Sequence, residues 1–378
     1  MGKRLSLCLM CVALALVLSG CWNYRSLDEM DLVVGIAIDF DKEADLFKIS
    51  FEVADLMGGS KDDAVKGRLV ESEGKTLFDA VRNAKKKEED RLFFGNALLV
   101  SVNQEVAREM GLSGILEWFL RDAECRETMS VVLSQEDTAK SILESPKDSG
   151  GIMSSTIYDI VAEDKQATGA TIHFDLYRLY DMINSPRNAA LLPAIHKIKM
   201  EDQEIPELNG IAICKGDKLA GFLSAEEAKY ALMVEDMLER GILPLSLGEM
   251  PTYDISLEIF ENKTRKSYTY EQDRMVVDIK TITNVTLAEN LNKMDPMDKE
   301  QVKLIEDAAQ RLIQNSIQDM IVKVQREYNV DIFGFGEMIY RKDPMLWDRL
   351  MPTWEEQFPT VEVKVTSKVH IVNSAFIK

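Results

Sequence analysis

The strongest helical pattern in the chain lies in residues 298–328, DKEQVKLIEDAAQRLIQNSIQDMIVKVQREY. Its apolar residues recur every three or four positions and form one stripe: Val302, Ile305, Ala309, Leu312, Ile317, Met320, Ile321, Val324 and Tyr328. At ~1.5 Å per residue, the predicted helix is about 45 Å long. The economical arrangement for a helix of this kind is to lie across an antiparallel sheet built from the strands around it.

Strand patterns flank this helix on both sides. Two long runs precede it, YDISLEIFE at 253–261 and RMVVDIKTITNVTL at 274–287. After it, Val361, Val363, Val365, Val369 and Ile371 share one face, with Ser367 among them. Upstream, LNGIAICKGDKLAGFLS at 208–224 predicts a hairpin, and Ser224–Glu227 predicts a capping box that opens a helix through Leu238. We therefore expect a C-terminal domain, 204–378, with an antiparallel sheet packed against a long helix.

The first half alternates strand and helix patterns. LVVGIAIDF and LFKISFEVADL predict a hairpin around residues 41–45, and Thr76–Lys87 predicts an amphipathic helix. Strand, helix, strand and helix patterns then follow at 91–102, 105–122, 127–134 and 136–145. A helix at 174–183 and a strand at 189–200 complete the half, whereas 149–169 gives no clear pattern. This predicts an N-terminal domain, 31–203, with a mixed sheet and helices, in an α+β chain of two to three domains.

The chain opens with a pattern typical of an exported lipoprotein. Lys3 and Arg4 precede an apolar run, Leu5–Leu18, which is shorter than the ~20 residues that span a bilayer. Leu18, Ser19, Gly20 and Cys21 then match a bacterial lipobox. We predict a signal peptide at 1–20 and signal peptidase recognition at Leu18, Ser19 and Gly20. Cys21 would carry S-diacylglyceryl and N-acyl groups and bind membrane lipid, and 21–30 would form the lipidated tether. The alternative is an ordinary secretory signal with a chance cysteine.

The acidic net charge of the chain limits the kinds of ligand that its folded part can bind. The formal net charge is −19. Cleavage of the first twenty residues would remove Lys3 and Arg4 but no acidic residue, so the mature part would be more acidic still. Such a body has no electrostatic footprint for nucleic acid and should be repelled by an anionic lipid surface. Attachment to a membrane must therefore be hydrophobic, which suits a lipid on Cys21. Trp22 and Tyr24 suit either the headgroup layer or packing into the body.

The search for catalytic or metal chemistry yields little. His173, His196 and His370 lack metal-ligand spacing, no GxSxG motif occurs, and Cys125 and Cys214 form no CxxC pair. Two further patterns have structural interpretations. The only GxG, at 334–336, suits a helix-terminating turn that buries Phe333 and Phe335, and Asp39, Asp41 and Asp45 suit a solvated turn better than a calcium loop. We expect no catalytic residue, no metal and no cofactor.

Taken together, the quoted segments resemble the Ger(x)C family, the lipoprotein C subunits of nutrient germinant receptors in endospore-forming bacteria. The start, LSGCWNYRSLDEMDLVVGIAIDFD at 18–41, is similar to the family's lipidated Cys-Trp followed by a Gly-Ile-x-x-Asp strand. GKTLFDAVRNA, RLFFGNALLVSV and LEWFLRDAECR resemble its N-terminal domain; GIAICKGDKLAGFLSAEE, VEVKVTSKVHI and the segment 324–359 resemble its C-terminal domain. Asn23 and Asn96 depart from the family's common aspartate and histidine. The resemblance covers nearly the whole mature chain in the expected order.

The resemblance implies a function and partners. It implies a non-enzymatic subunit of a spore nutrient germinant receptor, on the outer face of the spore's inner membrane, working with a polytopic A subunit and a transporter-like B subunit. FGFGEMIYR at 333–341 and the exposed face of the long helix are candidate contacts with those partners, against the alternative of internal packing. Two other functions stay open: a lipid-anchored nutrient-binding protein, and a cell-envelope hydrolase that uses unrecognised carboxylates.

Overall fold

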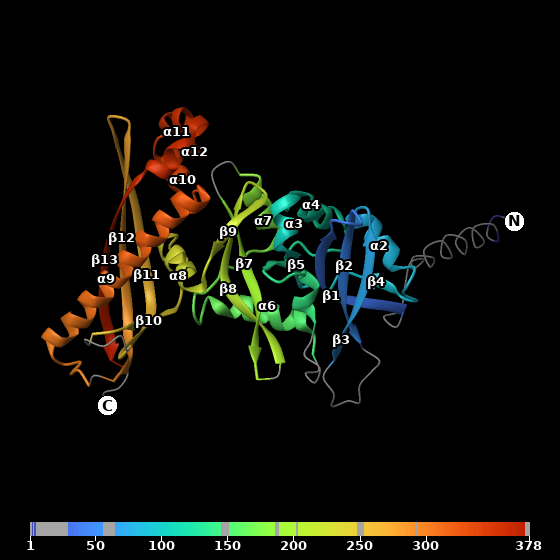
Figure 1. Ribbon diagram of the computed structural model, residues 1–378, viewed down its shortest axis with the longest axis horizontal. Helices are drawn as coiled ribbons and strands as arrows, with labels where there is room; N and C mark the ends of the chain where they lie inside the picture. The colour runs from blue at the N-terminus through green and yellow to red at the C-terminus, as the bar shows by residue number, and fades with distance from the viewer. Residues whose placement is uncertain are drawn as a thin grey trace.

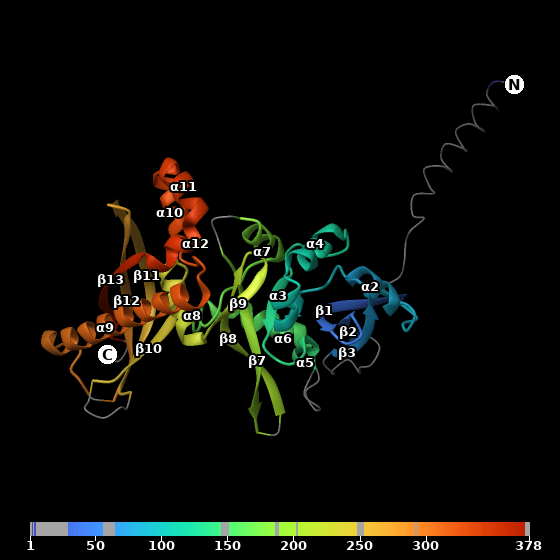
Figure 2. The same ribbon diagram turned by 45° about the horizontal axis from the view of Figure 1, so that its top comes forward.

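The computed structural model gives the chain two β-sheets with helices packed against both (Figure 1). Besides Gly2 and Arg4, it describes residues 29–55, 65–144, 151–185, 189–201, 203–247, 253–291 and 293–374. The two sheets lie side by side along the long axis of the molecule, with the N-terminal elements at one end and the four-stranded sheet at the other (Figures 1 and 2).

The larger sheet has nine strands and is mixed, as predicted. Its order is β3-β2-β1-β5-β6-β7-β8-β9, and β4 also pairs with β1. Pairing is parallel from β1 through β5 and β6 to β7, and antiparallel in the outer pairs. The bounds are β1 (Met30–Asp41), β2 (Leu46–Asp55), β3 (Lys66–Gly74), β4 (Arg91–Phe93), β5 (Leu99–Asn103), β6 (Ser130–Ser134), β7 (Ala190–Met200), β8 (Gln203–Lys215) and β9 (Lys218–Leu223).

Helices cover both faces of the sheet's parallel centre, which explains why β1, β5 and β6 are buried throughout most of their length. One face packs against α5 (Ala139–Leu143) and α6 (Met153–Asp164). The other packs against α2 (Leu77–Ala84), α3 (Gln104–Glu109), α4 (Ser113–Arg121) and α7 (Leu176–Ile183). The helix α6 lies in the segment 149–169, for which no clear pattern was predicted.

Two predicted elements of the N-terminal half are each split in two. The strand predicted at 91–102 is interrupted by a turn between β4 and β5, and the helix predicted at 105–122 breaks between α3 and α4. The second break is at Gly111, whose φ of 82° is a left-handed conformation that glycine adopts without a Cβ penalty. A local break of this kind does not alter the apolar periodicity, so the pattern predicted one long helix.

The smaller sheet holds β10 (Gly241–Leu245), β11 (Ile255–Glu271), β12 (Arg274–Asn290) and β13 (Glu362–Ser374), in that order. The pairs β10–β11 and β11–β12 are antiparallel, but β13 pairs parallel with β12, which corrects the expectation of a wholly antiparallel sheet. The long helix is the reason. It carries the chain back along the sheet, so the next strand starts at the same end as β12, as in any strand–helix–strand crossover.

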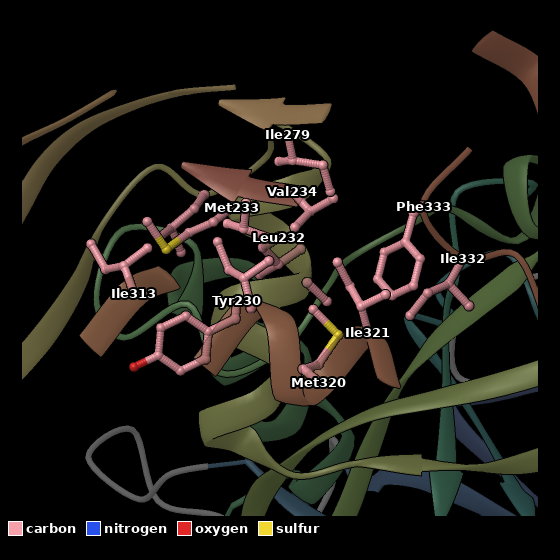
Figure 3. Close-up of a cluster of buried hydrophobic side chains, with 14 of the residues drawn as sticks. Tyr230, Leu232, Met233, Val234, Ile279, Ile313, Met320, Ile321, Ile332 and Phe333 are labelled. Carbon is pink, nitrogen blue, oxygen red and sulfur yellow. The ribbon is translucent and has the colours of Figure 1, made fainter. Parts of the chain in front are cut away.

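The predicted long helix is present as α9 (Lys299–Lys323), capped by Asp298 and extended by a π-helical turn over Val324–Tyr328. It packs on the smaller sheet together with α8 (Ala225–Val234), which opens with the predicted Ser224 capping box. Side chains of both helices, including Tyr230, Met233, Ile313 and Met320, meet in one apolar cluster (Figure 3). The short helices α10 (Phe335–Lys342), α11 (Pro344–Leu350) and α12 (Trp354–Gln357) follow.

The two sheets share a core. Ile211, Ile213 and Leu223 of the larger sheet belong to the same buried cluster as α8, α9 and the smaller sheet. At this junction Tyr328 covers Gly221, where an added Cβ would lie 2.2 Å from the ring, and the Tyr328 hydroxyl donates to the Phe222 carbonyl at 2.7 Å. The boundary expected near Gln203 falls at the start of β8, so strands on both sides of it belong to one sheet.

Candidate functional site

The predicted lipid-attachment residues, Leu18, Ser19, Gly20 and Cys21, lie outside the described residues, as do Trp22 and Tyr24. What the structure does describe is the point at which the chain enters the fold. Met30, the first residue of β1, pairs with Arg91 of β4, and Leu32 pairs with Phe93. The chain that follows the predicted tether therefore joins the body at the end formed by β4 and the neighbouring helix α2.

The segment Gly35–Asp39 of β1 holds two helices in place. A Cβ on Gly35 would lie 1.6 Å from Ser154 Oγ and 2.6 Å from Ser154 Cβ, so only glycine lets the first turn of α6 approach the strand this closely. At the other end of the segment, the Asp39 carboxylate accepts the Ala139 and Lys140 N–H groups at 2.6 and 3.1 Å. These N–H groups lie at the start of α5 and have no partner within that helix.

A second buried carboxylate serves α6 in the same way. Glu52 on β2 accepts the Met153 and Ser154 N–H groups at 2.6 and 2.7 Å, and Ser154 Oγ also donates to it. The residue before this helix, Ile152, offers no capping side chain, so a strand residue supplies the cap. Burial raises the pKa of both Glu52 and Asp39, although the N–H donors act in the opposite direction.

This arrangement corrects one sequence-based interpretation. Asp39 was expected in a solvated turn with Asp41 and Asp45, but its side chain is buried and caps a helix. Asp41 does serve the turn, accepting the Glu43 and Ala44 N–H groups at 3.0 Å each. Asp39 and Glu52 are both buried and hold helix N-termini, so both have positional roles in the fold.

The segment 333–341, FGFGEMIYR, supplies internal packing in its first half. Phe333 and Phe335 are fully buried, as predicted, and contact Phe358. The turn begins α10 instead of ending a helix, because Gly334 (φ 62°) precedes the first helical residue. Asp331 fixes it by accepting the Phe335 and Gly336 N–H groups at 3.1 and 2.8 Å. The buried phenylalanines are therefore not available to a partner.

The outer face of α9 remains a candidate contact surface. Leu304 is 51% exposed there, and the charged residues Lys303, Arg311 and Asp319 are exposed along the same helix. The opposite face carries Ile305, Ala309, Ile313 and Ile317, all buried against the smaller sheet and α8. The helix thus divides into a packed side and a side open to solvent.

A cleft of about 370 Å³ lies between the two parts of the molecule, bordered by α7, the β8–β9 turn and α12. The three charged side chains that line it, Lys215, Asp331 and Glu355, are already engaged. Lys215 and Glu355 pair across it at 2.8 Å, and the Asp331 carboxylate is held by backbone N–H groups. Within the described ranges, then, this cleft presents no convergent set of free charged groups to a small ligand.

The remaining candidate chemical groups are dispersed. His173 stacks edge-on with Tyr158, His196 lies 2.9 Å from Glu207, and His370 is on β13. Cys125 and Cys214 are free thiols whose pKa burial raises to about 12, which disfavours the reactive thiolate. Among the described residues, no cluster of three or more histidine, cysteine or acidic side chains could hold a metal ion. No helix in that part of the chain is long and apolar enough to cross a bilayer.

Both halves of the chain match models of known protein families. The family model "Spore germination protein N-terminal domain" matches residues 23–197, and "Spore germination B3/ GerAC like, C-terminal" matches residues 209–375. The chain is 23% identical to spore germination protein KC of Bacillus subtilis (strain 168), covering 96% of this chain and 95% of that protein. It is also 23% identical to spore germination protein B3 of the same strain, covering 95% of both. Among solved structures, the GerBC protein matches with a TM-score of 0.61 at 19% identity, covering 90% of this chain and 97% of that one.

Proposed function

We propose that this chain, which belongs to the Ger(x)C family of spore germination proteins, is the lipid-anchored C subunit of a nutrient germinant receptor. In this proposal it is a non-catalytic scaffold or interaction subunit. It lies on the extracytoplasmic face of the spore's inner membrane and contacts the polytopic A and B subunits. Nutrient-triggered germination would require it.

One observation carries this proposal: a lipobox stands immediately before two family domains that together cover nearly all of the remaining chain. The lipobox ends at Cys21, and the two matches run over 23–197 and 209–375. The order is that of an exported protein whose whole folded body follows its anchor. The domain division proposed is a signal peptide at 1–20, a tether at 21–30, and two domains at 31–203 and 204–378.

The proposed anchor explains how an acidic body stays at a membrane. A single acyl chain binds a bilayer only marginally, whereas several chains on one residue hold firmly, at about 0.8 kcal/mol per buried CH₂. The segment from Cys21 to Asp31 reaches at most about 35 Å when fully extended. Attachment to the same membrane as the A and B subunits raises their effective concentration for one another without any new contact.

The interaction role, as opposed to catalysis, is supported by how the polar groups are used. The buried Asp39 and Glu52 and the half-buried Asp331 all accept backbone N–H groups that position helices or turns. The exposed side of α9, with Leu304 and Arg311, is the proposed protein contact. These carboxylates therefore have structural roles, and the outer surface is left for partners.

A nutrient-binding protein with two hinged lobes fits these observations less well. Such proteins close around a ligand by moving one lobe against the other. Here the two parts share one apolar cluster, and Tyr328 is fitted against Gly221. A junction of this kind resists hinge motion, so we favour the interaction subunit.

The proposal is tested by replacing the lipidated residue. Spores that carry Cys21→Ala in place of the wild-type chain should lose the protein from the membrane fraction, fail to retain it on affinity-purified A and B subunits, and respond weakly to nutrient. Cys125→Ala, which removes a half-buried free thiol, is the matched control and should behave as the wild type. Full membrane retention and normal germination of the Cys21→Ala spores would contradict the proposal.

A further inference from the structure

The end of the molecule where the chain enters the fold has a surface unlike that of the body as a whole. Figures 1 and 2 both place α2 at the end of the long axis opposite the four-stranded sheet, and β4 pairs there with the first residues of β1. Any anchor preceding Met30 is therefore tied to this end. The surface of α2 is the surface that a short tether would bring nearest to the membrane.

The outer face of α2 combines one exposed ring with basic side chains. Its inner face, Leu77, Ala80 and Ala84, is buried. On the outer face, Phe78 is 52% exposed, and the Arg82 guanidinium lies 4.9 Å from the centre of its ring. Lys85 and Lys86, which directly follow the last residue of α2, are also exposed. Phe78 and Arg82 are four residues apart on the helix and share a face, so the ring and this guanidinium point outward together.

The exposed charged side chains at this end are mostly basic, whereas the chain as a whole has a net charge of −19. Residues 77–90 contain four basic and four acidic side chains, but all four basic ones, Arg82, Lys85, Lys86 and Lys87, are exposed, whereas Glu89 is the one exposed acid among them. Of the acidic residues nearby, Glu88 is paired with Arg68 at 2.9 Å and Glu124 is paired with Arg91. Arg82 and the lysines that follow α2 therefore form a small exposed basic surface on an acidic protein.

A hollow of about 620 Å³ adjoins this surface. Apolar side chains, Val81, Leu92, Phe94 and Trp118, line it together with the basic Arg82, Lys85 and Arg91 and the acidic Asp122 and Glu124, of which Glu124 is paired with Arg91. Apolar rings beside exposed basic side chains are a combination that suits the interfacial layer of a bilayer, where rings insert and basic groups meet anionic headgroups.

We propose that the outer face of α2, with Phe78, Arg82, Lys85 and Lys86, rests on anionic lipid headgroups of the membrane to which Cys21 is attached. This rests on the proposed function, because it takes the lipid anchor as given and adds an orientation. The larger sheet then stands with its β4 end on the membrane, and the smaller sheet with α9 points away from the lipid. Partner subunits reach α9 only through parts that extend beyond the bilayer surface.

The test compares two matched positions on the lipidated full-length protein bound to vesicles of phosphatidylcholine with phosphatidylglycerol. Phe78→Cys and Phe260→Cys each receive a thiol-reactive fluorophore, and a headgroup-labelled lipid quencher is added. Phe260 is the control because it is 54% exposed, also has an arginine 4.9 Å from its ring centre, and lies on β11 in the opposite sheet. Quenching is expected at position 78 and not at 260. It should fall when Lys85→Glu and Lys86→Glu are added, or when the vesicles contain phosphatidylcholine alone.

The proposed orientation would be overturned by equal quenching at both positions, by no quenching at either position, or by quenching that does not depend on the charge of the lipid. Co-sedimentation of the same samples separates this result from failure of the anchor. Protein that sediments with the vesicles but shows no quenching at position 78 contradicts the orientation alone. Protein that does not sediment contradicts the lipid anchor, and the orientation with it.

Discussion

At the scale of single residues, Gly35 and Asp39 show what a short motif does in this fold. Both lie on β1, one at the closest approach of α6 and the other at the first turn of α5. The sequence correctly predicted a strand here, but not these roles, because their partners, Ser154 and Ala139, are about a hundred residues away along the chain. Local patterns carry no information on such long-range contacts.

Gly35→Ala should destabilise the protein by about 1–3 kcal/mol, since the added methyl overlaps both Ser154 Oγ and the less movable Ser154 Cβ. Gly114→Ala is the control. It lies in α4, has open space around the new Cβ, and should leave the free energy of unfolding unchanged or raise it by up to about 1 kcal/mol. Urea unfolding of both variants measures the difference; equal stability of the two would refute the close-approach interpretation.

Glu52 gives a pH-dependent prediction at the same scale. Burial raises its pKa in the folded protein above the ordinary value of 4.5, so the folded state holds the proton more tightly than the unfolded chain. Its contribution to stability is then complete below about pH 4.5 and is lost as the pH rises through the folded pKa. Between about pH 4.5 and 7, we expect the urea midpoint of the wild type to fall more than that of Glu52→Gln.

The exposed Glu43→Gln variant serves as the control for that comparison and should follow the wild-type curve. A wild type whose stability rises relative to Glu52→Gln over the same interval would show that the N–H donors of α6 outweigh burial.

At the scale of elements, the C-terminal half followed its sequence pattern more closely than the N-terminal half. The alternation of β13 is confirmed from Val361 through Val369, and the Ser224 capping box is present. The stripe on α9 was also confirmed in outline, although it omitted Ile313, which fills the step between Ala309 and Ile317 and is buried. Long amphipathic helices and strands are predicted well because the alternation of buried and exposed positions is repeated many times along them.

Other elements had no such repeated signal. The strand β10 is five residues long and contains Pro244, so its pattern is too short to separate from a loop. The parallel pairing of β13 depends on the direction in which α9 returns the chain, which hydrophobic alternation does not encode. These differences arise from tertiary geometry and not from misread local preferences.

The two sides of α9 should respond differently to truncation. Ile313→Ala removes a fully buried side chain from the cluster in Figure 3 and should cost about 2–5 kcal/mol of unfolding free energy. Leu304→Ala, on the exposed side of the same helix, should change it by no more than about 0.5 kcal/mol. Chemical denaturation measures both, and a large loss for Leu304→Ala would show that this side is also packed.

At the scale of the whole molecule, the structure is an elongated body with its chain entry at one end. The two sheets share a core, so the orientation of one fixes the orientation of the other. The proposed tether of ten residues would then restrict how far the entry point can move from a bilayer. With the proposed anchor in place, this shape would put α2 near the membrane and α9 away from it.

The central claim is that lipid on Cys21 holds this body at the spore membrane, and mass spectrometry of the mature amino terminus tests it most directly. Protein purified from spore membranes should yield an amino-terminal peptide that begins at Cys21 and carries a diacylglyceryl group. An amino-terminal peptide with an unmodified Cys21, or one that still contains Leu18, Ser19 and Gly20, would contradict the account.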